Sequence, residues 1–286
     1  MNEKNLKYLK DNLKYMGFGE KLNADLENGL KEGKPEFDLQ LREKMFQGNM
    51  EVNLHFRQSP SSDVYFFNSY EARLTKDNGH DISQSFYVNN GKGVTYKEAY
   101  NLLDGRSVLK DMTNKEGEKY SAWIKLDFSK NAANNHFETR QFHGEKYGFN
   151  LSAEMNKLAI ATMPEDKEKQ LMQSLQKGNR QAVNFIKDAK EIPMFIEANP
   201  QFKVINVYDT SGRQLSKFEK EQYLKTDPGN SQEQNVVKEE EQSLGKKESG
   251  QAEIITSDRT VKPAVKNIEA LLPQKEGRKR KGLKII

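Results

Sequence analysis

The sequence predicts an α+β fold in which an N-terminal helical hairpin precedes a largely antiparallel β-sheet with one inserted helix. Three observations lead to this prediction. Apolar residues near the N-terminus recur at helical spacing, whereas from residue 37 to residue 142 they alternate with a period of two. The turns between the alternating runs are short, as antiparallel strands allow. After residue 224 apolar residues become scarce, which is typical of a disordered segment.

These shifts divide the 286 residues into three predicted domains. Residues 1–148 form an α+β core domain, and residues 149–224 form a small module of helices followed by a β-meander. Residues 225–286 form a disordered linker with a basic tail.

The helical hairpin is predicted from two apolar stripes, separated at Gly17 and closed at Gly33. The stripes consist of Leu6, Leu9, Leu13 and Met16, and then of Leu22, Leu26 and Leu30. We interpret the pair as a layer that packs on the sheet. A pair of helices that contacts a partner or DNA is the alternative.

The central feature of the core domain is a predicted β-hairpin over residues 52–74, with its turn at 59–62. Alternation places Val64, Phe66, Tyr70 and Leu74 on one face and Tyr65 and Phe67 on the other. Because the second strand has apolar side chains on both faces, we expect it to lie inside the sheet.

Further strands are predicted at 37–41, 82–88, 108–109, 120–128 and 136–142, giving about six or seven strands in one sheet. Thr95 and Glu98 form a capping-box pattern that begins the inserted helix, and Gly105 ends it. In the second module, helices are expected at 151–158 and 165–175. The meander strands are expected at 182–186, 194–198 and 202–208.

Composition limits the classes of function. The chain has no cysteine, which excludes disulfides, thiolate zinc sites and cysteine nucleophiles. Its charged start lacks the apolar core of a signal peptide, and no apolar run approaches the length of a membrane span. We therefore expect a cytoplasmic protein with no membrane partner.

The four histidines are the first candidates for catalysis, and they are His55, His80, His136 and His143. His136 with Glu138 could form an acid–base pair, or a metal site together with Asp127. Exposed polar positions on an antiparallel sheet explain the same residues better. We predict no catalytic residue, metal ligand or cofactor, and no small-molecule substrate is evident.

Nucleic acid is one predicted partner, because the basic residues gather at the C-terminal end. The last fourteen residues contain one acidic residue and six basic ones, which are Lys275, Arg278, Lys279, Arg280, Lys281 and Lys284. Such a cluster neutralises phosphates without reading sequence, although a merely solvated terminus has the same composition. On the sheet, Arg57, Arg73 and Lys125 are candidate phosphate contacts beside a stacking platform of Tyr65, Phe67 and Tyr87. For these rings we favour the alternative, that they belong to the core.

Four segments, at 13–20, 63–68, 120–128 and 178–209, resemble a family of unknown function encoded on conjugative and mobile elements of gut anaerobic bacteria. The likeness extends to about residue 220 and implies a mobile-element context without supplying catalytic residues. We therefore expect a non-enzymatic accessory or interaction protein that contacts nucleic acid through its basic tail. An inhibitor of a host defence protein complex and a nucleic-acid-processing enzyme are the alternatives.

Overall fold

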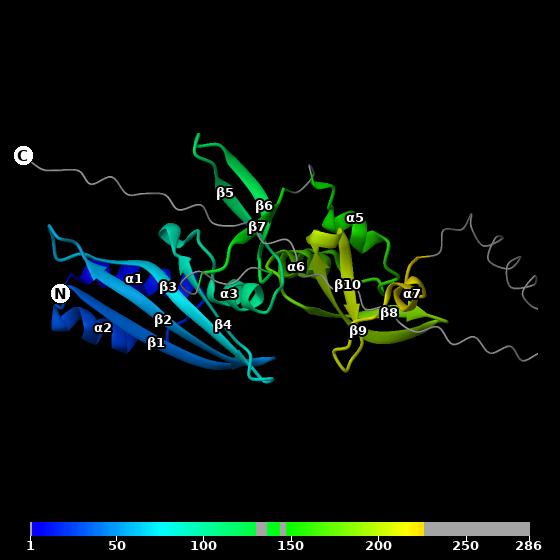
Figure 1. Cartoon of the computed structure of the whole chain (residues 1–286), viewed down its shortest axis with the longest axis horizontal. Helices are drawn as coiled ribbons and strands as arrows, with labels where there is room; N and C mark the ends of the chain where they lie inside the picture. Colours follow the sequence, from blue (N-terminus) through cyan, green and yellow to red (C-terminus); the bar gives the residue numbers. More distant parts are fainter. Residues whose placement is uncertain (1, 130–135, 144–146, 226–286) are drawn as a thin grey trace, which may run out of the picture. The chain divides into compact units, whose positions relative to one another are not determined.

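The structure is a computed structural model, which describes residues 2–129, 136–143 and 147–225 (Figure 1). These residues belong to one compact unit. They confirm the predicted α+β class, with N-terminal helices followed by antiparallel sheets. The predicted disordered linker and basic tail, from residue 226 onward, lie outside the described residues.

The first part of the chain is a helical hairpin on a four-stranded antiparallel sheet of order β1-β2-β3-β4. Its elements are α1 (Glu3–Tyr15), α2 (Asn23–Glu32), β1 (Glu36–Met45), β2 (Gly48–Gln58), β3 (Tyr65–Lys76) and β4 (Asp81–Tyr87). Leu9 and Leu13 of α1 and Leu26 of α2 are fully buried in the same core as the sheet. The hairpin therefore packs on the sheet, as predicted.

A β-bulge in β3 changes which side chains face this core. Phe67 lies opposite Phe56 of β2, whereas Ser69 lies opposite the preceding residue, His55. Asn68 is therefore an extra residue, and the alternation of side chains shifts by one position there.

As a result, Tyr65 and Phe67 are buried on the same side as Tyr70, while Phe66 is half exposed. The predicted grouping of Phe66 with Tyr70 was wrong. The favoured interpretation, that these rings belong to the core, is confirmed for Tyr65 and Phe67 and was wrong for Tyr87, which is exposed. The expectation that β3 lies inside its sheet is confirmed, because β2 and β4 flank it.

The single sheet of six or seven strands was wrong, because the strands form two separate sheets. After β4 the chain continues through η1 (Asn89–Gly91), α3 (Tyr96–Leu103), β5 (Val108–Thr113), β6 (Lys119–Leu126) and β7 (Thr139–Phe142). The predicted capping box of Thr95 and Glu98 is present at the start of α3. The ammonium group of Lys110, on β5, also donates a hydrogen bond to the carboxylate of Glu98, on α3, at 3.0 Å. This contact links β5 to α3. The strands after α3 therefore form a new sheet, of order β5-β6-β7.

The third sheet is the predicted meander, of order β10-β9-β8. The last elements are α5 (Leu151–Asn156), α6 (Glu165–Gln176), β8 (Gln181–Lys187), β9 (Lys190–Asn199), η2 (Pro200–Phe202), β10 (Val204–Tyr208) and α7 (Lys217–Glu221). The short helix α7 was not predicted.

Two hydrophobic cores meet on β6. Ile124 and Leu126 pack in the first core, whereas Trp123, on the opposite face, packs in the second. Trp123 alternates in sequence with Ala122 and Ile124, which is why it lies on the face opposite Ile124. Because both faces of β6 are buried, the middle sheet joins the two cores. No helix in the described part of the chain is long and apolar enough to cross a membrane.

Candidate functional site: a cationic cleft beside helix α3

The two predicted phosphate contacts on the four-stranded sheet are engaged with carboxylates. Arg57 and Arg73 lie on the face of the sheet that points away from the helices. The Arg57 guanidinium is 3.2 Å from Glu36, and that of Arg73 is 3.2 Å from Asp81. A phosphate would have to compete with these carboxylates for both arginines.

Lys125 lies in another sheet, on β6. Its ammonium group donates a hydrogen bond to the side chain of Gln201 at 3.1 Å. Burial lowers the pKa of this lysine. Because β6 belongs to the sheet β5-β6-β7, Lys125 is not on the same sheet as Arg57 and Arg73. The six predicted contacts from Lys275 to Lys284 lie outside the described residues.

The suggested metal site at His136 is not formed. Nδ1 of His136 is 2.9 Å from the side-chain nitrogen of Gln84. Asp127 is engaged through both of its oxygens, by Ser129 and by Arg140. Within residues 2–129, 136–143 and 147–225, no group of three or more histidines and carboxylates is placed to hold a metal ion.

The hydrogen bonds of Asp127 instead lead us to predict that the stability of the fold depends on pH. Hydrogen bonds from Ser129 and the guanidinium of Arg140 lower the pKa of Asp127 from 3.8 to about 2. Because this pKa is depressed in the folded state, the stabilisation is present above about pH 4 and is lost as the pH falls toward 2. The Asp127→Asn variant should therefore lose less stability than the wild type between pH 4 and pH 2, measured by urea unfolding. An Asp11→Asn variant, altered at an exposed position of α1, is the control. Equal pH dependence in the wild type and Asp127→Asn would refute this assignment.

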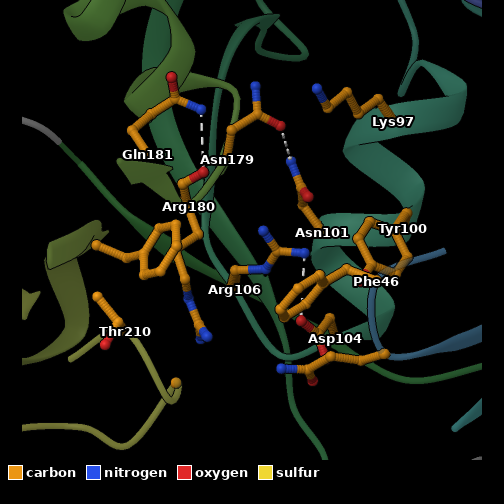
Figure 2. Close-up of a pocket in the computed structure, with 13 residues that line it drawn as sticks. Phe46, Lys97, Tyr100, Asn101, Asp104, Arg106, Asn179, Arg180, Gln181 and Thr210 are labelled. Atoms are coloured by element: carbon orange, nitrogen blue, oxygen red, sulfur yellow. Dashed lines mark hydrogen bonds and ion pairs between the residues drawn. The ribbon is translucent and has the colours of Figure 1, made fainter. Parts of the chain in front are cut away.

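The strongest candidate site is a cleft of about 340 Å³ that lies between helix α3 and the start of strand β8 (Figure 2). Its walls come from the β1–β2 turn, helix α3 and the loop after it, the α6–β8 turn, strand β9 and the turn after β10. Figure 2 shows Lys97 and Tyr100 on helix α3 at one side, with Arg180 and Gln181 at the other.

The floor of the cleft is held by hydrogen bonds between segments far apart in sequence. Asn101, at the end of α3, is 1% exposed, and its amide nitrogen donates to the carbonyl of Lys177 at 2.6 Å and to Asn179 at 2.9 Å. Arg106 donates from Nη1 to the carbonyl of Gly178 at 3.1 Å. The loop after α3 is therefore fastened to the α6–β8 turn.

Arg106 is also part of a buried charge cluster. Its Nη2 lies 3.2 Å from one oxygen of Asp104, and the other oxygen of Asp104 lies 3.0 Å from Lys76. The guanidinium carbon is 5.0 Å from the ring centre of Tyr100, a cation–π arrangement. Burial, followed by the charge of Asp104, raises the pKa of Tyr100. The carboxylate of Asp104 therefore orients both Arg106 and Lys76.

Arg180 is held on the opposite wall by a second buried carboxylate, Glu197. Nε and Nη2 of Arg180 donate to one oxygen of Glu197 at 3.2 and 3.1 Å. The other oxygen accepts the hydroxyl of Tyr208 at 2.6 Å, and the guanidinium lies 3.7 Å from the centre of the Tyr208 ring. Burial, followed by Glu197, raises the pKa of Tyr208 well above its usual value. This network fixes the orientation of Arg180.

Two buried polar atoms of the residues that line the cleft have no hydrogen-bond partner among the described residues. They are Nε of Arg106 and the side-chain oxygen of Asn101. Lys97 is exposed at the cleft, and Phe46, in the β1–β2 turn, is 80% exposed. The lining contains three cations, Lys97, Arg106 and Arg180, and one carboxylate, Asp104. Chemically, the arrangement suits an anionic ligand with a flat face.

Sequence reasoning missed every residue of this cleft. One signal was present: Arg106 directly follows Gly105, and Asn179 and Arg180 directly follow Gly178. Both glycines have a positive φ and lie just beyond a helix end. Polar side chains directly after such glycines lie near helix C-termini, where they can donate hydrogen bonds to the last backbone carbonyls of a helix.

No protein-family model, no curated protein sequence and no solved structure matches this chain. The resemblance to a mobile-element family therefore remains a prediction.

Proposed function

We propose that this chain is a non-enzymatic accessory protein of a mobile genetic element, and that it contacts nucleic acid through the basic residues from Lys275 to Lys284. One observation carries the nucleic-acid contact: the last fourteen residues hold six basic residues against one acidic residue, in a chain whose formal charge is only +4. The rest of the chain is therefore slightly acidic. A cluster of this kind binds phosphates by releasing their counterions, independently of sequence.

The folded part supports this assignment, because the candidate phosphate contacts on its sheets are already engaged by other side chains. Arg57 and Arg73 each lie beside a carboxylate, and Lys125 donates to a glutamine. Exposed ion pairs of this kind contribute little to stability, yet they reduce the positive charge that a phosphate meets. The mobile-element context is supported by the resemblance of residues 178–209 and the three earlier segments.

The test is a combined variant, Arg278→Gln, Lys279→Gln, Arg280→Gln and Lys281→Gln, hereafter the tail-neutral variant. Binding to a random-sequence DNA duplex is measured by fluorescence anisotropy over a series of salt concentrations. If all six basic residues meet phosphates, the slope of log K against log salt should be about −5 for the full chain and about −2 for the variant. Affinity at low salt should fall accordingly.

A matched control removes four exposed lysines from helices of the described unit: Lys4→Gln, Lys7→Gln, Lys167→Gln and Lys217→Gln. This control has the same net charge as the tail-neutral variant, so it should retain the slope of the wild type if contact is local to the tail. Equal loss of slope in both variants would show that net charge alone drives binding. Absence of DNA binding by the full chain would defeat the proposal outright.

A further inference from the structure

We propose that the cleft beside α3 is a binding site for a single nucleotide, that is, a flat heteroaromatic base carrying an anionic phosphate. The site is separate from the basic tail, and the proposal does not depend on the tail. The nucleotide could be free or could belong to an unpaired strand, and the experiment below separates these two sources. The volume of about 340 Å³ falls in the range of small-molecule sites.

The buried polar groups of the floor favour a ligand with both an acceptor and a donor. Nε of Arg106 is a free donor, and the side-chain oxygen of Asn101 is a free acceptor. The two residues are adjacent, because the backbone N–H of Arg106 donates to the backbone carbonyl of Asn101 at 2.9 Å. Buried polar atoms are rarely left without partners. The edge of a nucleobase presents acceptors and donors side by side and would satisfy both groups.

The charges of the walls favour a phosphate. Lys97 has no ion-pair partner among the residues that the structure describes. The ion pair of Arg180 with Glu197 uses Nε and Nη2, which leaves Nη1 available. Arg106 and Arg180 are each paired with a carboxylate, Asp104 and Glu197 respectively. The unpaired positive charge that an anionic group would meet in the cleft is therefore that of Lys97, beside the available Nη1 of Arg180.

An exposed aromatic side chain completes the site. Phe46 lines the cleft from the β1–β2 turn, where a large apolar ring that is 80% exposed gains nothing from the core. Phe195 of β9 also lines the cleft and is half-buried. Aromatic rings next to cations are the arrangement on which proteins stack unpaired bases. Together, the floor, the cations and the rings match the three parts of a nucleotide.

The proposal is tested by isothermal titration calorimetry on the tail-neutral variant, so that the tail does not contribute. The probes are AMP, adenosine and inorganic phosphate. We expect AMP to bind with one-to-one stoichiometry, and adenosine and phosphate to bind at least about tenfold more weakly. Lys97→Met and Phe46→Ser, both at exposed positions, should each reduce AMP affinity about tenfold without affecting folding. Lys4→Met and Phe202→Ser, exposed and outside the cleft, are the matched controls and should leave AMP affinity unchanged.

Competition between AMP and a short single-stranded oligonucleotide then identifies the source. Stronger competition by the oligonucleotide assigns the site to a strand, and stronger competition by AMP assigns it to a free nucleotide; either result supports the site. Three results would overturn it: no binding of AMP, equal binding of phosphate and AMP, or AMP binding that is unaffected by Lys97→Met and Phe46→Ser. Failure of the tail to bind duplex DNA would leave this proposal standing.

Discussion

Replacing Glu197 with alanine should lower the free energy of unfolding by about 3–5 kcal/mol, since breaking a buried ion pair leaves its partner charged and unpaired. Glu197 is 7% exposed and accepts hydrogen bonds from Arg180, Tyr208 and Asn206. The variant would leave the guanidinium of Arg180, whose side chain is 19% exposed, without an ion-pair partner beside the Tyr208 ring. The loss is measured by urea unfolding at neutral pH.

Glu191→Ala is the control for this effect. Glu191 lies on the same strand, β9, but its side chain is exposed and accepts a single hydrogen bond, from Asn184 at 2.7 Å. We expect its removal to cost less than about 1 kcal/mol. Similar losses in the two variants would mean that the Glu197 network does not stabilise the fold as the geometry indicates.

Replacing Gly178 with alanine should cost about 2–4 kcal/mol, from a strained backbone and an overpacked contact together. Gly178 follows α6 with a φ of +76°, a conformation that side chains with a Cβ atom rarely adopt. A Cβ atom there would lie 2.6 Å from the backbone oxygen of Ser107 and 3.2 Å from Cβ of Asn101. The clash would push apart the two segments that Asn101 and Arg106 fasten together.

Gly212→Ala separates the two causes. Gly212 has a φ of +86°, but a Cβ atom added there would have no neighbour within 4 Å. Backbone strain alone should cost about 1 kcal/mol. Thermal and urea unfolding of both variants should therefore show the larger loss for Gly178→Ala. Equal losses would indicate that the α6–β8 turn moves freely away from Ser107.

Local patterns predicted the secondary structure well, because periodicity and capping act within a few residues. The Thr95–Glu98 capping box and the meander between residues 181 and 208 are examples. The bulge at Asn68 was not visible, since an extra residue in one strand is defined only against its partner strand. The division into separate sheets was missed for a similar reason: alternation assigns a strand its faces but does not assign its neighbours.

Apart from the polar residues that follow Gly105 and Gly178, the sequence contains no signal of the cleft, because tertiary packing assembles it. Asn101 and Asn179 are separated by 78 positions, and neither stands in a motif with a known ligand. Arg106 and Arg180 become informative only once Asp104 and Glu197 are seen to orient them. The basic tail is the opposite case, since its charge is a property of composition and needs no fold to be recognised.

We propose that duplex DNA contacts the tail rather than the folded unit. Lysine acetylation followed by mass spectrometry, with and without a random-sequence DNA duplex, tests it most directly on the full chain. We expect DNA to protect Lys275, Lys279, Lys281 and Lys284, and to leave exposed lysines of the folded unit, such as Lys4 and Lys167, as reactive as before. Protection concentrated on folded lysines, with an unchanged tail, would contradict the claim.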